Sequence, residues 1–522
     1  MSEQPARKPI DFPKPDSGPR AVKSGADRLD SWKEIASYLR RGARTLQRWE
    51  HEQGLPVHRL RHDQGSTIYA YKSELDAWMA QQRTVVEMHP PADDEAGPSI
   101  AVLPFTDISR EKDQGYFCEG MAEEIINALS RIQGLRVASR TSAFQFKMAS
   151  ADSREIGRRL RVGTLLEGSV RKAENRLRIA VQLIDAESGY QLWTGRYDRE
   201  MSDVFSIQEE IAKNIVDTLA VTLTAEETGA LRKTPTRDVQ AYDYYLRGRK
   251  FYYRYNRRDV EFAIQLFAHA IELDPAFALA HAGLADCWSY IYFNAERSEH
   301  ARQEAGTASL RAVELDPGSA QAQASRGLSL SLNRRNADAD RAFETAIRLD
   351  PGLFEAHYFY ARHAFACGEL EKAVGLYEDA MRVQPENYQA PLLVAQSYDV
   401  LGRPEEARAC RERGIRNAEE HLKLSPEDAR AVYMAANGLA ALGEKERGFE
   451  WAQRALRMEP DEPMVLYNVG CIYSLLGKLD EAIEVLEKAV RRGLTHRGWY
   501  EHDSNLDPLR ATPRFQKLLA AL

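Results

Sequence analysis

Residues 339–351 read ADRAFETAIRLDP, and residues 373–385 read AVGLYEDAMRVQP. The second stretch repeats the first 34 positions later, with alanine, an aromatic residue and alanine in the same places before a closing proline. A 34-residue period is typical of tetratricopeptide (TPR) repeats, in which each pair of helices buries its apolar face only by stacking on the next pair. These stretches therefore predict an all-α superhelix.

The closing motif of these stretches recurs through the carboxyl-terminal half of the chain. Six related strings, AIELDP, AVELDP, AIRLDP, AMRVQP, HLKLSP and ALRMEP, end at Pro275, Pro317, Pro351, Pro385, Pro426 and Pro460. Their spacings are 42, 34, 34, 41 and 34 residues, and a seventh copy, AVRRGL, ends 34 residues later at Leu494. The two longer spacings indicate insertions of 8 and 7 residues. An unrelated helical bundle would not keep this register, so we predict a TPR superhelix of about seven repeats over residues 239–522.

Changes of composition divide the rest of the chain. Residues 1–28 are rich in Pro, Gly, Ser and charge, which favours a disordered arm. Residues 81–98 carry a proline pair and an acidic run, and residues 222–238 separate two kinds of periodicity, so both segments are predicted linkers. A small head at 29–80 and a middle domain at 99–221 remain.

The overall composition limits the class of protein. With 43% apolar residues and a formal net charge of −7, the chain is not generally basic, so any nucleic-acid site must be local. The amino terminus has no apolar signal region, and no charge-free apolar run reaches the roughly 18 residues of a membrane span. We expect a soluble, cytoplasmic protein without membrane association. The five cysteines are far apart and form no CxxC pair, which favours reduced, mostly buried thiols.

The head has the pattern of a helix, a tight turn, a second helix, a hairpin and a closing helix. The first helix carries an apolar stripe of Trp32, Ile35, Ala36 and Leu39. The second helix turns Leu46 and Trp49 inward, and its opposite face offers hydrogen-bond donors suited to bases and phosphates: Arg44, Gln47, Arg48 and His51. Residues 40–48 hold four arginines and no acid, although residues 31–80 carry only eight basic against six acidic side chains.

Strands at 57–61 and 67–70 should form a basic hairpin, and Leu75 and Trp78 should pack back on the core. The segment resembles the winged helix-turn-helix heads of MerR-type and excisionase-type bacterial regulators, although Gly42 and Ala43 stand where a Ser or Thr helix cap is usual. The resemblance implies that the second helix enters the major groove of double-stranded DNA. The DNA-binding residues expected on this basis are Arg41, Arg44, Thr45, Gln47, Arg48, Arg59 and Arg61.

The middle domain alternates strands and helices. The strand SIAVLPF at 99–105 precedes a helix at 120–132, and two hairpins follow in which Leu177, Ile179, Val181 and Leu183 alternate with more polar residues. This pattern predicts an α/β sheet domain. Through LPF, EGMAEEI, LEGSVR and LWTGRYD it resembles the amino-terminal domain of the translocation protein TolB. In that family the domain and its TPR tail follow several heads, including class III nucleotide cyclases, protein kinases and winged helices.

Motifs of catalysis are absent from the sequence. It contains no GxxxxGK[ST] loop, GxGxxG turn, HExxH helix or GxSxG elbow, and neither the cyclase nor the kinase catalytic domain. The pairs Glu123/Glu124 and Glu209/Glu210 are expected on solvent faces of helices. His357 and His363 are too widely spaced for a metal pair on one helix. We expect no enzyme activity, no cofactor and no metal.

These features predict a multidomain fold of a small winged-helix domain, an α/β sheet domain and an all-α TPR superhelix. The function predicted first is a DNA-binding transcriptional regulator whose tail binds protein partners, and the alternative is a non-enzymatic adaptor whose head binds protein. Small DNA-binding heads usually occupy two half-sites, so the chain is a candidate homodimer. The predicted peptide groove contains Tyr358, Arg362, Gln389, Gln396 and Tyr467. A cluster of aromatic residues is expected to form the seam between the middle domain and the first repeat: Tyr242, Tyr244, Tyr245, Phe251, Tyr252 and Tyr253.

Overall fold

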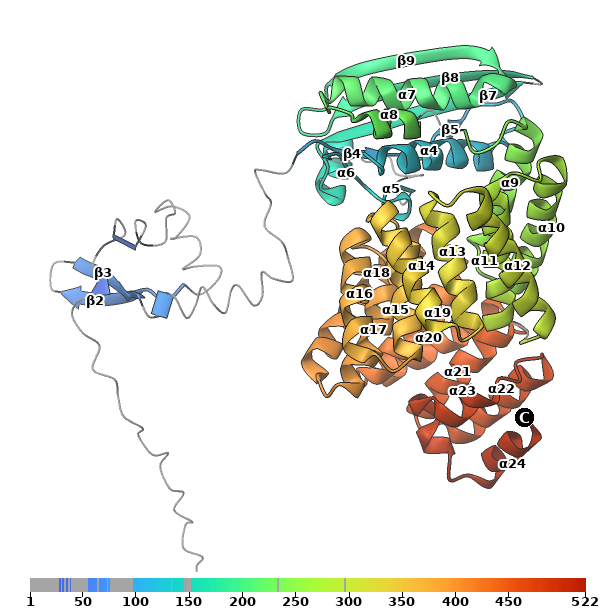
Figure 1. The fold of residues 1–522 in the computed structure, drawn as a ribbon. Helices are drawn as coiled ribbons and strands as arrows, with labels where there is room; N and C mark the ends of the chain where they lie inside the picture. The colour runs from blue at the N-terminus through green and yellow to red at the C-terminus, as the bar shows by residue number, and fades with distance from the viewer. Residues whose placement is uncertain are drawn as a thin grey trace, which may run out of the picture. The chain divides into compact units, whose positions relative to one another are not determined.

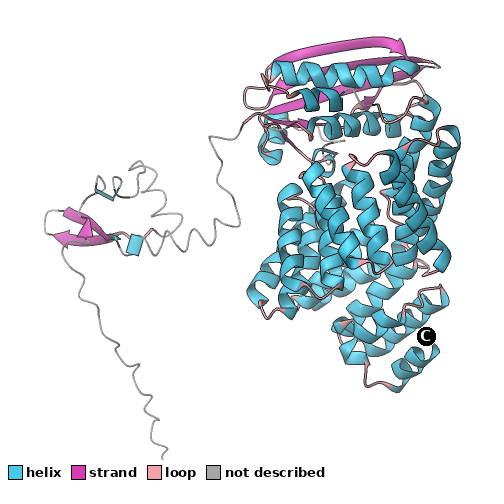
Figure 2. Ribbon diagram, viewed as in Figure 1, coloured by secondary structure: helices cyan, strands magenta, loops and turns pink. Residues whose placement is uncertain are grey.

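The computed structural model contains two compact units, residues 1–96 and residues 97–522. It describes residues 28–29, 31, 34–35, 38, 55–62, 65–72, 74–75, 97–132, 134–144, 146, 152–173, 175–231, 234–294 and 297–522. Within the second unit, an α/β sheet domain lies at one end of a long series of helix pairs (Figures 1 and 2). This order confirms the predicted α/β domain followed by an all-α region.

In its described part, the first unit contains a small antiparallel sheet with the strand order β1-β3-β2. β2 (His58–His62) and β3 (Gly65–Tyr71) form the predicted hairpin, and β1 (Arg28–Leu29) pairs with the end of β3. Its buried apolar cluster is made of Leu29, Ile35, Leu55, Ala70 and Leu75. The positions of Ile35 and Leu75 agree with the predicted core. The segment of the predicted second helix lies outside the described residues, so the winged-helix assignment stays a prediction.

The second unit begins with a mixed sheet. Its main path is β6-β4-β7-β8-β9, and β5 (Thr106–Asp107) pairs with β7. The strands of that path are β6 (Arg136–Val137), β4 (Ser99–Val102), β7 (Thr164–Ala173), β8 (Arg176–Asp185) and β9 (Gln191–Glu200). The first strands are parallel, whereas β7, β8 and β9 form two antiparallel hairpins. Alternate residues of β8 are buried as predicted, because a pleated strand turns every second side chain to the core.

Helices cover both faces of this sheet. α4 (Gly115–Leu129) and α7 (Val204–Thr218) share one core with the sheet and with the first helices of the tail. α5 (Arg140–Phe144) and α6 (Ser153–Leu160) belong to a smaller cluster with Ala101, Leu103 and Leu165. Because neighbouring residues of a strand face opposite sides, these two clusters lie on opposite faces of the sheet.

The tail contains seven helix pairs over residues 239–491. Their bounds are α9 (Val239–Tyr252), α10 (Arg257–Leu273), α11 (Ala278–Asn294), α12 (Glu299–Leu315), α13 (Ala320–Leu332), α14 (Asn336–Leu349), α15 (Phe354–Ala366), α16 (Leu370–Val383), α17 (Gln389–Val400), α18 (Pro404–Leu424), α19 (Ala429–Ala441), α20 (Lys445–Met458), α21 (Pro463–Leu475) and α22 (Leu479–Arg491). The longer spacings in the sequence correspond to longer helices: α11 and α12 have 17 residues each, and α18 has 21.

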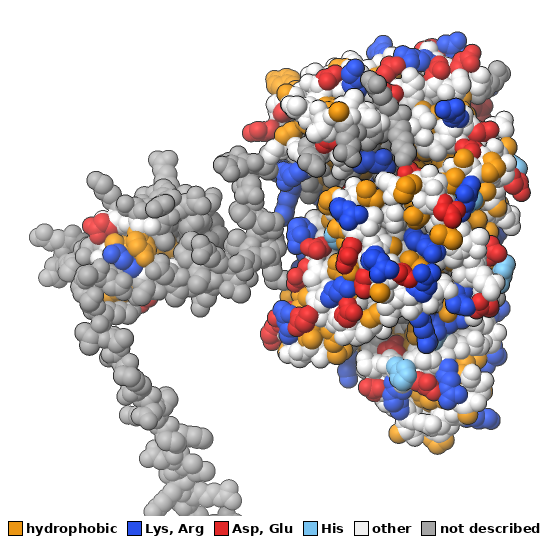
Figure 3. All heavy atoms as spheres, viewed as in Figure 1, with side chains coloured by type: hydrophobic (Ala, Val, Ile, Leu, Met, Phe, Trp, Pro, Cys, Tyr) orange, Lys and Arg blue, Asp and Glu red, His pale blue; other side chains and the backbone are white. Residues whose placement is uncertain are grey.

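Small residues let the helices of a pair approach closely. A Cβ atom added at Gly327 of α13 would lie 2.8 Å from the Phe343 ring of α14. The aromatic residue of the repeat therefore occupies the space that glycine leaves free, as the sequence register predicts. Acidic and basic side chains are interspersed on the visible face of the tail (Figure 3). A short helix α23 (Arg497–His502), a 3-10 turn η3 (Ser504–Leu509) and α24 (Pro513–Ala521) follow the last pair.

The segment 222–238, expected to be a linker, is largely structured. It contains α8 (Ala225–Leu231), which contacts α4 and α7, and Leu223 and Leu231 pack against the common core. The predicted aromatic seam is confirmed at Tyr242 and Tyr245, which are fully buried between the sheet domain and the first repeats. The middle domain and the tail therefore share one continuous core.

Candidate functional site

The head residues predicted to contact DNA are only partly described. Arg41, Arg44, Thr45, Gln47 and Arg48 lie outside the described residues. The backbones of Arg59 and Arg61 belong to β2, in register with Ile68 and Ser66 of β3, and their side chains are also outside the described set. Their role in DNA binding stays a prediction.

A polar and aromatic cluster joins the described segments of the head. The His58 and Tyr69 rings stack at 5.0 Å between centroids, and the Arg28 guanidinium lies 4.2 Å from the Tyr69 ring centroid. The Nε2 atom of His58 is 2.6 Å from Oε2 of Glu74. This cluster ties β1, the hairpin and residue 74 together. The sequence alone does not indicate this cluster, because the pairing of His58 with Tyr69 depends on the hairpin register.

The predicted peptide groove is partly filled by the chain's own side chains. Tyr358 is 4% exposed, and its hydroxyl accepts a hydrogen bond of 3.2 Å from Nη2 of Arg430 on α19. The same guanidinium lies 5.2 Å from the ring centroid of Tyr255, at the start of the tail. Burial of Tyr358 therefore contradicts its predicted role as an accessible groove residue.

The prediction that Tyr467 is accessible in the peptide groove is also wrong. It is 5% exposed, and its hydroxyl donates a hydrogen bond of 2.9 Å to Oδ2 of Asp503, because the segment after the last helix pair folds over it. Of the other predicted groove residues, Gln396 is exposed, and Arg362 and Gln389 are half-buried. A role of these three residues in peptide binding stays a prediction. Alignment of the repeats could not foresee that the chain itself covers Tyr358 and Tyr467.

The glutamates of α4 also correct the sequence analysis. Glu123, expected on a solvent face, is 6% exposed and forms an ion pair with Arg140, whose Nε lies 3.0 Å from Oε2. Its other oxygen accepts a hydrogen bond from Nη2 of Arg249 on α9, and Nη1 of that arginine donates to the hydroxyl of Tyr245 at 3.0 Å. The tail thus buries one face of α4, and a carboxylate placed there is compensated by two arginines.

Further polar contacts join the sheet domain to the tail at separate points. The Tyr116 hydroxyl of α4 donates a hydrogen bond of 2.6 Å to Oδ1 of Asp243, and Arg247 pairs with the other oxygen of that carboxylate at 2.7 Å. The Ser142 hydroxyl of α5 donates to Oε1 of Glu386 before α17. These contacts join the sheet domain to two parts of the tail that are far apart in the sequence, α9 and the turn before α17.

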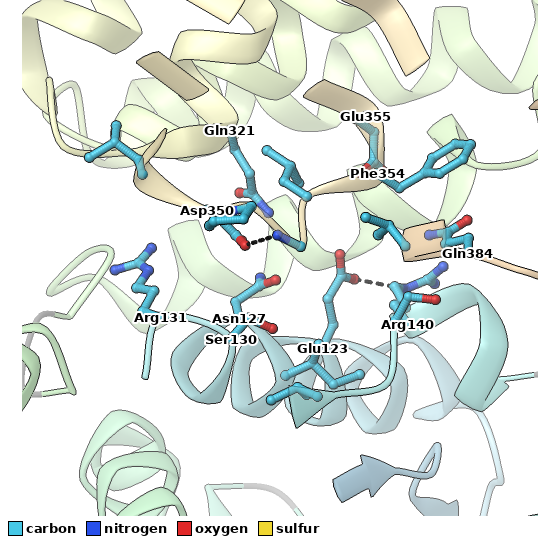
Figure 4. Close-up of a pocket in the computed structure, with 18 of the residues that line it drawn as sticks. Glu123, Asn127, Ser130, Arg131, Arg140, Gln321, Asp350, Phe354, Glu355 and Gln384 are labelled. Atoms are coloured by element: carbon cyan, nitrogen blue, oxygen red, sulfur yellow. Dashed lines mark hydrogen bonds and ion pairs between the residues drawn. The ribbon is translucent and has the colours of Figure 1, made fainter. Parts of the chain in front are cut away.

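A cavity of about 510 Å³ lies between the sheet domain and the tail (Figure 4). One wall comes from the end of α4 and the residues up to Arg140, and the other comes from the turns that precede α15 and follow α16. Six arginines line the cavity: Arg131, Arg136, Arg140, Arg249, Arg348 and Arg382. Only three carboxylates accompany them: Glu123, Asp350 and Glu355. No sequence motif indicates this site, because only the tertiary fold brings its arginines together, from the turn after α4 and from β6, α5, α9, α14 and α16.

Burial alters the protonation of several acids around the cavity. Burial and the like charge of Glu123 raise the pKa of half-buried Glu124 to about 7. Burial also raises the pKa of Asp350 to about 6, although its Oδ1 accepts a hydrogen bond of 2.9 Å from the Gly352 backbone amide. The pKa of Glu355 is raised for the same reason. Near neutral pH the negative charge of this region is therefore lower than its number of carboxyl groups suggests.

The described residues offer little for metal chemistry. Among them, no group of three or more His, Cys, Asp or Glu side chains is arranged to hold a metal ion. His357 and His363 are both buried, and their ring nitrogens contact the Pro351 carbonyl oxygen and the Ser331 hydroxyl. Four cysteines are buried free thiols and Cys367 is an exposed one. In the described part of the chain, no helix is both long and apolar enough to cross a membrane.

Parts of the chain match known families. Residues 96–217 match the family described as the second domain of HilA/YgeH-like transcriptional regulators. Residues 325–387, 392–463 and 465–492 match tetratricopeptide repeat families, which confirms the repeat assignment. The match over 96–217 places this domain among regulator domains, whereas the TolB resemblance stays a prediction.

One curated relative is "Putative adenylate cyclase 3" of Rhizobium meliloti (strain 1021), which is 37% identical over 266 residues. The match covers 50% of this chain and 45% of the relative, so the chain spans about half the length of that protein. Similar solved structures include a monomeric IFIT1 mutant with Gppp-AAAA, at 15% identity and a TM-score of 0.41, covering 57% of this chain and 66% of that one. The Cut9–Hcn1 hetero-tetramer structure matches at 15% identity and a TM-score of 0.39, covering 61% and 62%.

Proposed function

We propose that this chain is a DNA-binding transcriptional regulator whose head reads double-stranded DNA and whose tail binds protein partners. The observation that carries the proposal is the match of residues 96–217 to a domain of HilA/YgeH-like transcriptional regulators. The tetratricopeptide matches support the protein-binding part, because stacked helix pairs of this kind present extended surfaces to partners.

The head supplies the DNA-binding part of the proposal. Residues 40–48 contain four arginines and no acid, in a segment whose pattern is helix, turn, helix and hairpin. On a helix in the major groove, Arg44, Gln47 and Arg48 would read base edges, and Arg41, Arg59 and Arg61 would contact phosphates. The net charge of −7 makes such local placement necessary, because the chain as a whole repels DNA.

Selection from random duplexes with the full chain tests this function. We expect enrichment of a defined sequence by the wild type and its loss in the double variant Arg44→Ala/Arg48→Ala. Circular dichroism of that variant must match the wild type, and Trp49→Ala serves as a reference for an unfolded head. If the folded double variant enriches the same sequence as the wild type, or if the wild type enriches none, the adaptor function replaces the regulator.

Protein partners should bind the second unit of the chain rather than the head. Residues 97–522 form one compact unit, so this fragment should capture the same proteins as the full chain in a pull-down. Deletion of the whole tail from residue 240 would be a poorer test of partner binding. The deletion would remove α9, which completes the core of the sheet domain. If the fragment 97–522 captures none of the partners of the full chain, the proposed division of labour is wrong.

We also propose that the chain is not an enzyme. The sequence contains no GxxxxGK[ST] loop, GxGxxG turn, HExxH helix or GxSxG elbow, and the curated relative is more than twice as long as the matched part. Purified full-length protein should convert ATP no faster than a heat-denatured control. Steady formation of cyclic AMP or ADP by the native protein would overturn this part of the proposal.

A further inference from the structure

The cavity between the sheet domain and the tail has an excess of positive charge. Its lining contains six arginines and three carboxylates. Glu123 is already shared by Arg140 and Arg249, so its charge is fully compensated inside the protein. The excess therefore belongs to the outer part of the cavity.

Three arginines of this outer part form no ion pair within 4.0 Å with an acidic side chain of the described residues. Arg131 follows α4, Arg136 belongs to β6, and Arg348 lies near the end of α14, and all three side chains are exposed. Arg382 differs, because its Nη1 lies 2.7 Å from Oδ1 of Asp379. In Figure 4, the Arg131 side chain rises from the end of α4 toward the Asp350 side of the cavity.

The carboxylates do not cancel this charge. Asp350 is the acid on the same side, and its pKa is raised to about 6 by burial, while the charge of Arg131 acts to lower it. Glu355 lies deeper, at the start of α15, and faces Arg249, Glu123 and Arg140. Neutral hydrogen-bonding groups complete the wall: Asn127, Ser130, Ser139, Gln321 and Gln384.

The size and the lining together indicate a class of ligand. A volume of about 510 Å³ is in the range of cavities that bind small organic molecules. Guanidinium groups present a planar fork that fits the oxygens of phosphate and carboxylate groups, and hydrogen bonds between charged groups are about twice as strong as neutral ones. Arginines on both walls could then share one ligand carrying several negative charges.

We propose that this cavity binds a small polyanion, which Arg131 and Arg136 of the sheet domain and Arg348 of the tail hold between the two parts of the second unit. Binding strengthens the attachment of the sheet domain to the tail, because the ligand contacts both walls. All residues that line the cavity lie outside the head. Anion binding can therefore be tested independently of DNA binding.

Calorimetric titration of the full chain tests the site with two probes, inorganic pyrophosphate and citrate. We expect saturable binding of one anion per chain and a rise in melting temperature, because a ligand that binds only the folded state stabilises it. Tighter binding of pyrophosphate assigns the site to phosphate groups, and tighter binding of citrate assigns it to carboxylates. Absence of saturable binding by both probes overturns the proposal.

The variant Arg131→Ala/Arg136→Ala should weaken binding of the preferred anion by about tenfold or more, because two charged hydrogen-bonding groups are removed. Both side chains are exposed, so the variant should keep the melting temperature of the wild type without anion. Arg110→Ala is the matched control, since Arg110 is an exposed arginine of the same domain that does not line the cavity. Equal weakening by the control, or none by the double variant, would show non-specific attraction and contradict the site.

Discussion

Helices α4 and α7 lie on the same face of the sheet, and each carries two adjacent glutamates, yet the two pairs have opposite environments. Glu123 of α4 is buried against the tail and held by two arginines. Glu210 of α7 has a side chain that is 40% exposed and forms a two-pronged ion pair with Arg199 of β9, at 2.7 and 3.1 Å. The sequence presents both pairs alike, on amphipathic helices of 15 residues.

The difference arises from what covers each helix. α7 keeps a polar face toward solvent, whereas α9 packs across α4 where Gly120 leaves room for Leu246. A buried ion pair is costly to break, because the remaining charge loses both its partner and its water. An exposed ion pair has little effect on stability, because water competes for both groups. We therefore expect substitutions on the two helices to lower the free energy of unfolding by amounts that decrease from the buried contacts of α4 to the exposed ion pair of α7.

The largest effect is expected for Glu123→Gln. This variant keeps the shape of the side chain but leaves Arg140 and Arg249 without their shared carboxylate. Loss of one partner of a buried ion pair typically costs about 3–5 kcal/mol. Denaturant unfolding of the full chain, followed by circular dichroism, measures the cost. A loss below about 1 kcal/mol, the range of exposed pairs, would mean that this contact is solvated in solution.

The second largest loss of stability is expected for Gly120→Val. A Cβ at this position would lie 2.4 Å from Cδ2 of Leu246, so the Leu246 side chain or one of the two helices must shift, and overpacking of this kind costs about 1–3 kcal/mol. Gly115→Ala is the control on the same helix, because no atom lies within 4 Å of its added Cβ. Melting curves of the two variants should separate clearly. If they coincide, α4 does not pack against α9 as described.

Glu124→Gln should change how the free energy of unfolding depends on pH. The folded pKa of Glu124, about 7, lies above its ordinary value of 4.5, so the folded state holds this proton more tightly than the unfolded state. The contribution of Glu124 to the stability of the wild type must then fall as pH rises from about 4.5 to 7, by about 1–2 kcal/mol after allowance for partial exposure. The variant lacks this loss and should be more stable than the wild type at pH 8 but not at pH 4. Parallel stability curves for both proteins would contradict the raised pKa.

The smallest effect is expected for Glu210→Gln. Its partner Arg199 is 39% exposed and remains solvated when the pair is broken, so the change should stay within about 0–1 kcal/mol and shrink in high salt. The same denaturation assay used for Glu123 provides the value. A loss as large as that of Glu123→Gln would remove the distinction between the two helices.

These differences also mark how far the sequence predicts the structure. The 34-residue period predicts the helix pairs, and alternation along β8 predicts its buried face, because both patterns are local and repeat at short range. Burial of Glu123 and Tyr358 could not be predicted in this way. Each depends on a partner far away in the chain, Arg249 in one case and Arg430 in the other. The arginines of the cavity escaped detection for the same reason.

The seam between the sheet domain and the tail could be predicted from the sequence only in part. The aromatic residues of α9 predicted a contact at that place, and Tyr242 and Tyr245 are buried there. The contact itself, a hydrogen bond of 2.9 Å from Nε2 of Gln208 to the Tyr242 hydroxyl, joins α7 to α9. Hydrophobic clustering in a sequence thus locates an interface, whereas the polar partners inside it require the fold.

The most direct measurement for the proposed regulator is a salt titration of DNA binding by the full chain, with Arg44→Ala and Arg59→Ala beside the wild type. Arg44→Ala, expected to lose base contacts, should weaken binding by about 1–3 kcal/mol and relax the preference at one base pair. Arg59→Ala, on the β2 strand, should weaken all sequences alike and reduce the salt slope by about one. If both folded variants bind like the wild type at every salt concentration, the head does not read DNA as proposed.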